Sequence, residues 1–182
     1  LNRNLYYFAG KDVWKTLFDL EAMRPGMVLL SAQAPDGDLA WCDVVTLMTP
    51  VATRPWEAWE GSAPGRRPEA YTALKAAMTQ ATVDFACARL PELRDAIAHT
   101  YAATPLTYRH YTGAPHGAAY GLLKDWRSIM ASHIPARTKF ENLLLTGQNL
   151  TVHGAIGVTL SAAATCSEIV GTEYLAKKIA NA

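Results

Sequence analysis

The sequence lacks an excess of charge of either sign. Its 182 residues include 17 Lys and Arg and 16 Asp and Glu, which gives a net charge of +1. Binding to a phosphate backbone requires a clear surplus of cations, so we expect no nucleic acid partner. The chain also lacks a run of about 18 apolar residues that could cross a bilayer, and its first residues show no signal-peptide pattern. We expect a cytoplasmic protein, and peripheral contact with a membrane stays open.

Residues suited to catalysis or metal binding are also scarce. The three cysteines, Cys42, Cys87 and Cys166, form no Cys-x-x-Cys pair, and their odd number argues against a disulfide framework. We expect buried thiols in a reducing compartment. The five histidines contain no His-x-x-x-His pair, so no metal site is expected, and no Gly-x-Ser-x-Gly elbow indicates a serine hydrolase. The sequence therefore indicates no catalytic residue.

What the sequence does contain is enough apolar residues for a core. Half of the residues are apolar, which favours a single compact body. Runs typical of strands at 27–33 and 39–48 flank the turn sequence at 34–38, and together they predict an antiparallel hairpin. Residues 5–8 are also typical of a strand. The spacing of apolar residues over 11–23 predicts a helix before the hairpin.

The middle of the chain predicts a buried loop followed by helices. Residues 50–68 are rich in Pro and Gly but carry Trp56 and Trp59, whose size favours burial on the body of the protein. A long helix from position 69 is indicated by four apolar residues at helical spacing, namely Leu74, Met78, Ala81 and Phe85. We expect a second short helix from Pro91 and a strand over 97–102.

The most informative stretch lies at 142–158. Residues 143–146 predict a short strand, Gly147 a turn, and residues from about 155 to 176 a helix whose first turn carries no charge. A helix N-terminus after a buried strand presents free N–H groups, which suit anionic or electron-rich parts of a nucleotide or flavin. Because glycine costs about 1 kcal/mol relative to alanine inside a helix, Gly157 indicates close approach of another element or a cofactor ring.

Two segments resemble a known family. The Leu-Leu-Leu-Thr-Gly-Gln run at 143–148, followed by Gly154 and Gly157, resembles the C-terminal flavin motif of the phytoene desaturase, carotenoid isomerase and retinol saturase group of FAD-dependent oxidoreductases. The run at 104–113, followed by 117–121, resembles the aromatic, Gly-containing segment that leads to the flavin in that group. A strand over about 118–123 is a separate expectation. The resemblance covers residues 104 to 171, and residues 1–103 match only in general texture.

One feature of that group is missing from the sequence, the Gly-x-Gly-x-x-Gly turn that holds the ADP part of FAD. The resemblance therefore implies the C-terminal part of a longer flavoprotein, which does not retain FAD without its N-terminal dinucleotide-binding domain. The implied fold is α+β. Residues 1–135 would form an antiparallel, substrate-domain-like sheet with packed helices, and residues 136–182 the C-terminal strand and helix of an FAD-binding domain.

The resemblance also implies roles for individual residues. Eight would contact the flavin: Gly147, Gln148, Asn149, Gly154, Ala155, Ile156, Gly157 and Val158. Five would line a tunnel for a hydrophobic substrate: Tyr108, His110, Tyr111, Tyr120 and His153. Both sets also have an ordinary explanation, since a strand-to-helix turn needs glycines and half-buried tyrosines are common in cores.

The first functional hypothesis follows from this resemblance. The chain would belong to a flavin-dependent oxidoreductase that exchanges a hydride equivalent with a carbon–carbon bond of an isoprenoid-like substrate, a carotenoid or retinoid, and it would be inactive alone. The rival is a non-catalytic protein-interaction domain that docks a partner through its Gly and Ala helix face. An amine-oxidase-like flavoprotein fragment is a third alternative, and a homodimer also stays open.

Overall fold

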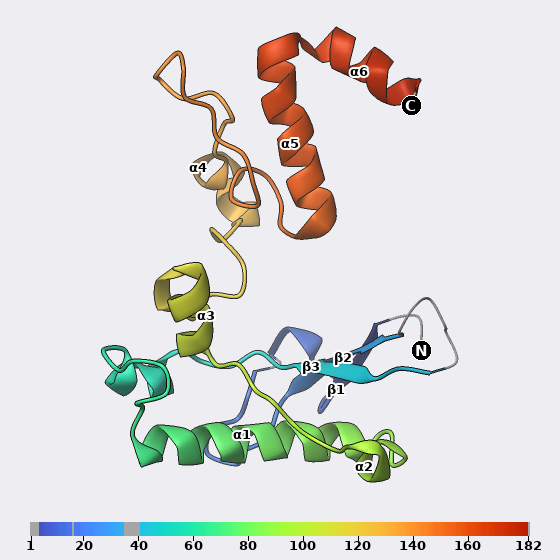
Figure 1. Cartoon of the computed structure of the whole chain (residues 1–182), viewed down its shortest axis with the longest axis vertical. Helices are drawn as coiled ribbons and strands as arrows, with labels where there is room; N and C mark the ends of the chain where they lie inside the picture. Colours follow the sequence, from blue (N-terminus) through green and yellow to red (C-terminus); the bar gives the residue numbers. More distant parts are fainter. Residues whose placement is uncertain (1–3, 16, 35–40, 182) are drawn as a thin grey trace. The chain divides into compact units, whose positions relative to one another are not determined.

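The computed structural model describes residues 4–15, 17–34 and 41–181 and has the predicted α+β composition (Figure 1). The chain divides into two compact units, Leu1–Gly117 (unit 1) and Ala118–Ala182 (unit 2). The expectation of a single body is therefore wrong. The division also falls upstream of the boundary placed at 135/136 from the sequence. The assignment of residues 1–135 to a substrate-domain-like region and of 136–182 to an FAD-binding element stays a prediction.

Unit 1 contains a three-stranded antiparallel sheet in the order β1 (Leu5–Phe8), β2 (Met27–Gln33) and β3 (Val44–Met48). Leu5 pairs with Leu30, and Gln33 pairs with Val44, so the antiparallel pairing of the predicted hairpin is confirmed. Its second strand, predicted over 39–48, covers only 44–48 of the described residues. Of the predicted turn at 34–38, residues 35–38 lie outside the described residues. Val28 and Leu30 are completely buried, because alternate residues of a strand share one face.

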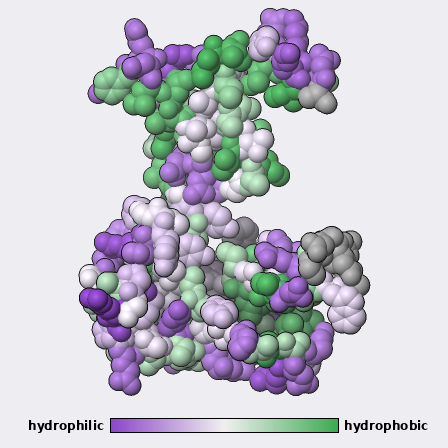
Figure 2. Space-filling view, in the orientation of Figure 1, coloured by the Kyte–Doolittle hydropathy of each residue, from purple (hydrophilic) through white to green (hydrophobic). Residues whose placement is uncertain are grey.

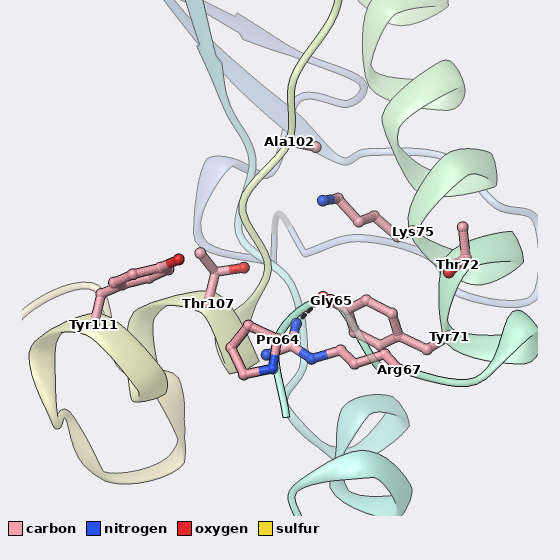
Figure 3. Close-up of a pocket in the computed structure, with 9 residues that line it drawn as sticks. All are labelled: Pro64, Gly65, Arg67, Tyr71, Thr72, Lys75, Ala102, Thr107 and Tyr111. Carbon is pink, nitrogen blue, oxygen red and sulfur yellow. Dashed lines mark hydrogen bonds between the residues drawn. The ribbon is translucent and has the colours of Figure 1, made fainter. Parts of the chain in front are cut away.

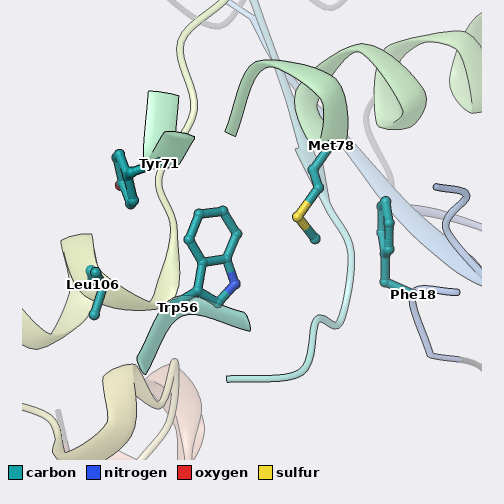
Figure 4. Close-up of a cluster of buried hydrophobic side chains, with 5 residues drawn as sticks. All are labelled: Phe18, Trp56, Tyr71, Met78 and Leu106. Atoms are coloured by element: carbon teal, nitrogen blue, oxygen red, sulfur yellow. The ribbon is translucent and has the colours of Figure 1, made fainter. Parts of the chain in front are cut away.

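The core of unit 1 gathers around the long helix α1 (Glu69–Cys87), which packs against β2 and β3. Its buried members are Phe18, Trp56, Tyr71, Met78 and Leu106 (Figure 4). Trp56 comes from the short helix η3 (Arg54–Trp59) and meets Tyr71 edge to face, with ring centroids 5.5 Å apart. The predicted long helix is confirmed, and so is the burial of Trp56. Trp59 is half-buried beside it.

Residues 105–112 form the helix α3 (Pro105–Thr112), which the sequence did not predict. Thr104 begins it with a capping box, in which the backbone N–H of Thr104 donates to Thr107 Oγ1 at 3.1 Å. Pro105 occupies the first helical position, where its missing N–H costs nothing. The helix ends at Gly113, with φ 68°, and the short η4 (Pro115–Gly117) follows. The aromatic run at 104–113 is therefore mostly helical.

The start of α3 offers a test of this packing. Thr104 is buried, and its Oγ1 lies 2.8 Å from the hydroxyl of Tyr71 in α1. We expect Thr104→Ala to lower the free energy of unfolding by about 1–2 kcal/mol, since it removes both the cap and the hydroxyl pair. Urea unfolding would measure the loss. Thr104→Ser keeps the hydroxyl and should lose clearly less, and equal losses for the two variants would contradict the role assigned to the hydroxyl.

The predicted helix over 11–23 is wrong. Among the described residues of that stretch, only η1 (Val13–Lys15) is helical. Asp19 and Arg24 instead form an isolated bridge, with backbone N to O distances of 2.8 and 3.0 Å. Asp19 Oδ1 also accepts a hydrogen bond from the backbone N–H of Ala22 at 3.0 Å. Aspartate competes for backbone N–H groups in this way, which favours a turn over a helix.

Three other runs with strand-like sequences do not form strands. Residues 97–102 and 118–123 have no strand pairing, and within 143–146 only Leu144 pairs, in an isolated bridge with Arg137. Their apolar composition suits a strand, but a strand also needs a neighbouring edge with which to bond. The short helix predicted from Pro91 is confirmed as α2 (Leu93–Ala96).

Unit 2 is largely helical. It contains η5 (Trp126–Ser128), α4 (Ile129–Ser132), α5 (Gly154–Val170) and α6 (Thr172–Ala180). The single helix predicted over about 155–176 is two helices, because Gly171 adopts φ 88°, a conformation outside the α-helix that favours glycine. A separate helix, α6, therefore begins at Thr172.

The surface of unit 2 is unusually apolar (Figure 2). Large side chains lie open to solvent on it, including Trp126 and Ile156, which are 82% and 78% exposed. Ordinary protein surfaces expose large apolar side chains one at a time, whereas unit 2 exposes many of them. The high apolar content of the sequence therefore does not all go into a core. In the described ranges, no helix is long and apolar enough to span a membrane.

The cysteines differ from expectation in two of three cases. Cys87 is buried in α1, as predicted, whereas Cys42 and Cys166 are exposed. The three buried thiols inferred from the sequence therefore reduce to one.

Candidate functional site

The candidate site begins at the N-terminus of α5. The preceding residue, His153, makes no side-chain cap, and the first turn holds no acidic residue. Gly154 opens the helix with φ 77°, and both Ala155 and Ile156 are exposed. Among the described residues, no side chain thus caps the first N–H groups of this 17-residue helix. Such an end carries positive partial charge and attracts anionic or electron-rich groups.

A narrow contact holds α5 against the segment 145–152. Gly157 is buried, and a Cβ atom at this position would lie 2.1 Å from the carbonyl oxygen of Val152. The sequence indicated close approach of another element or a cofactor ring at Gly157. The close approach is confirmed, and the neighbour in the structure is the backbone of the chain itself, at Val152.

Hydroxyl groups continue this contact one and two turns farther along α5. Ser161 is completely buried, with its Oγ 3.2 Å from Thr151 Oγ1. Thr165 Oγ1 donates to the carbonyl oxygen of Leu145 at 2.7 Å. The small residues on this face of α5 therefore make a specific polar seam with 145–152.

Lys124 joins three segments of unit 2. Its Nζ donates to the carbonyl oxygens of Ser132, Asn149 and Leu150 at 2.5, 2.6 and 3.0 Å. The side chain of Asn149 adds a fourth link, because its Oδ1 accepts from the backbone N–H of Leu122 at 2.8 Å. Sequence reasoning missed Lys124, since a lone lysine in a loop gives no signal of the distant carbonyls that it meets. It also assigned Asn149 to the flavin, whereas in this structure its Oδ1 is engaged within the chain.

Two of the predicted substrate residues lie beside the start of α5. The rings of Tyr120 and His153 are 5.5 Å apart between centroids and tilted by 32°. His153 Nε2 lies 3.4 Å from the carbonyl oxygen of Leu122, and a proton on that nitrogen would be donated to it. The structure thus brings an aromatic pair to the same end of the helix as the free N–H groups.

The other three predicted substrate residues are in unit 1. Tyr108, His110 and Tyr111 lie on α3, where the rings of His110 and Tyr111 meet edge to face at 4.7 Å. Tyr111 is 75% exposed. Tyr120 and His153 belong to unit 2, and the shared role of the five residues stays a prediction.

The remaining flavin candidates are part of the same short stretch of chain. Gly147 has φ 105° and closes a turn, in which its carbonyl oxygen accepts from the N–H of Leu150 at 3.3 Å. Gln148 is half-buried with no hydrogen bond to another described residue, and Val158 is exposed on α5. The segment 147–158 thus consists of the turn at Gly147, the hydrogen-bonded Asn149 and the start of α5.

One carboxyl group of unit 2, that of Asp125, has a shifted pKa. Hydrogen bonds from the side chain and backbone of Arg127 lower the pKa of Asp125. Asp125 thereby stays ionised and caps η5. No group of three metal-ligating side chains occurs within the described ranges. The uncapped start of α5 can orient and polarise a bound group.

The chain is similar to curated oxidoreductases. The chain is 31% identical over 128 residues to the all-trans-retinol 13,14-reductase of Macaca fascicularis, and 30% identical over 128 residues to that of Homo sapiens. Each match covers 68% of this chain and 21% of the relative. The chain is thus a homologue of the retinol saturase group, and the resemblance seen in its sequence is confirmed at that level.

The similarity extends to a relative described as inactive. The inactive all-trans-retinol 13,14-reductase of Danio rerio is 30% identical over 104 residues, which is 56% of this chain and 17% of the relative. No protein family profile matches the chain, and no solved structure matches it. The chain spans about a fifth of the length of the curated relatives that it matches.

Proposed function

We propose that this chain is part of a flavin-dependent oxidoreductase that acts on a carbon–carbon bond of a retinoid or a similar isoprenoid. The similarity to all-trans-retinol 13,14-reductases supports the reaction class and the hydrophobic substrate. The flavin rests on the resemblance of 143–158 to the flavin motif of the wider group. Peripheral membrane contact, a homodimer and a cytoplasmic location belong to the same proposal.

The observation that carries the proposal is the uncapped, neutral start of α5. FAD, when bound, would supply the exchange of a hydride equivalent with the substrate. The N–H groups of Ala155 and Ile156 fit its electron-rich pyrimidine edge, because no acidic side chain in the first turn repels that edge. Gly154 adds no side chain that would obstruct approach. The residues present thus fit the group.

The role of the chain would be placement. The Tyr120 and His153 rings give a largely apolar wall beside the helix start, which suits a polyene that offers few polar handles. Positioning a substrate next to a cofactor can itself supply much of a rate enhancement. The sequence holds no Gly-x-Gly-x-x-Gly turn, so we expect FAD retention to depend on a dinucleotide-binding domain that supplies this turn.

The substitution Ala155→Asp tests this role without damaging the fold. A carboxylate in the first turn of a helix stabilises that helix by about 0.3–1 kcal/mol, so the variant should fold at least as well as the parent. The same carboxylate would repel the electron-rich pyrimidine edge of the flavin. We expect flavin affinity to fall by about tenfold or more, a change of about 1.4 kcal/mol. The measurement is the visible absorption of bound flavin in the product of the full reading frame.

Ala162→Asp is the matched control, because Ala162 is exposed on the same helix but lies two turns from its start. It should keep the bound flavin. A colourless but folded full-length protein, or an Ala155→Asp variant with undiminished flavin, would reject the proposed function.

A further inference from the structure

A partly open cavity lies within unit 1 between α1 and α3. Its volume is about 350 Å³, within the range of sites for small molecules. The residues that line it are Pro64, Gly65, Arg67, Tyr71, Thr72, Lys75, Ala102, Thr107 and Tyr111 (Figure 3). Two of them carry positive charge and none carries negative charge. The cavity therefore has a cationic lining.

Lys75 is the cation free to meet a ligand. It lies on α1, and Figure 3 shows its ammonium group extending into the space toward Ala102 and Thr107. No carboxylate among the described residues pairs with it. An ammonium group with three donors and no partner is a ready contact for an anion.

Arg67 supplies a second charge, which no carboxylate in the described part of the chain neutralises. Its two terminal nitrogens donate to the hydroxyl of Tyr71 and, at 3.2 Å, to the carbonyl oxygen of Leu106. Its guanidinium carbon lies 4.5 Å from the centre of the Tyr71 ring, and its Nε is buried without a hydrogen-bond partner. These contacts fix the guanidinium in place but leave its charge uncompensated. A partly buried cation of this kind favours a counter-ion nearby.

Neutral groups complete the lining. The hydroxyls of Thr72 on α1 and Tyr111 on α3 make no hydrogen bond to any other described residue, so both can donate to an anion. The aromatic ring of Tyr111 and the apolar Pro64 and Ala102 offer surface to an uncharged body. The combination fits one anionic group attached to a small flat or apolar moiety.

We propose that this cavity binds a phosphate monoester, with Lys75 in direct contact and Arg67 holding the potential of the cavity positive. A phosphate monoester carries a charge of about −1.5 to −2 at neutral pH, which matches the two cations of the lining better than a singly charged carboxylate does. The site does not rest on the proposed function, because it uses none of the residues at 147–158, nor Tyr120. Tyr111 is the one lining residue that the sequence also assigned to the substrate tunnel.

Isothermal titration of the chain with phenyl phosphate tests the proposal. Saturable binding is expected, and Lys75→Gln should weaken it by about tenfold to a hundredfold, the range for losing one charged hydrogen bond. Lys178→Gln removes the same charge from α6 and should leave the affinity unchanged. No saturable binding, or equal weakening by the two variants, would overturn the site.

Two further titrations define the ligand. Benzoate has the same ring with a single negative charge and should bind clearly more weakly than phenyl phosphate, so equal affinity would refute the phosphate assignment. Phosphatidylcholine vesicles that contain phosphatidic acid present the same phosphate monoester on a lipid. If they displace phenyl phosphate, the site is supported with a lipid source, and if they do not, it is supported with a free small molecule as ligand.

Discussion

Replacing Gly157 by valine should unfold much of unit 2. The carbonyl oxygen of Val152 lies 2.1 Å from the position of a Cβ atom at Gly157, and the carbonyl carbon lies at 2.4 Å. Both are backbone atoms, so no rotamer change can make room, and α5 would have to move away from 145–152. We expect a loss of about 3 kcal/mol in the free energy of unfolding, at the upper end for overpacking. Urea unfolding followed by circular dichroism would measure it.

Ala162→Val is the control for this prediction. It adds a β-branched side chain to the same helix at an exposed position, so it tests helix propensity without the steric conflict. The control should lose well under 1 kcal/mol. If Gly157→Val proved no less stable than the control, the close packing of α5 against Val152 would be wrong.

Lys124→Met should lower the free energy of unfolding by a similar amount, because it removes a positive charge that donates hydrogen bonds. Methionine keeps the length and apolar stem of the lysine but removes the ammonium that serves the carbonyls of Ser132, Asn149 and Leu150. We expect a loss of about 3 kcal/mol, since charged hydrogen bonds vanish and carbonyl groups are left without their donor. The same urea titration would detect it, and Lys178→Met, on exposed α6, should change little.

An arginine at position 124 separates charge from geometry. Arginine restores the positive charge, but its planar fork cannot point three donors toward carbonyls that surround one atom. Lys124→Arg should therefore recover only part of the lost stability. Full recovery would mean that the charge alone matters and that the three-way hydrogen bonding described for Nζ has little effect.

The sequence predicted those elements whose cause is local. Alternating and helical apolar patterns identified β2, β3 and α1, and the bulk of Trp56 indicated its burial. The same local patterns misled over 11–23, because the side chain of Asp19 captured the backbone N–H of Ala22 and turned the chain. They also predicted strands at 97–102 and 143–146, where the described residues offer no partner edge for a ladder.

In the candidate site, too, the sequence predicted the features with a local cause and missed the contacts between distant residues. The turn at Gly147 and the uncharged helix start are properties of contiguous residues, so the sequence located them. The hydrogen bond from Lys124 Nζ to the carbonyl oxygen of Asn149 joins residues 25 positions apart, and no sequence spacing predicts such a contact. The partner of Gly157 could be inferred to exist but not identified, since a small residue indicates proximity without saying to what.

The polar seam of α5 has a consequence for ligand affinity. Ser161 with Thr151, and Thr165 with Leu145, fix the helix along its axis, because sliding by one turn of about 5.4 Å would separate both pairs. The dipoles at the start of the helix are thus preorganised, and a ligand that meets them need not restrain a moving element. The conformational entropy of the N-terminal end of α5 is lost when the chain folds, not when a ligand binds. Ordering this end of the helix therefore subtracts nothing from the binding free energy.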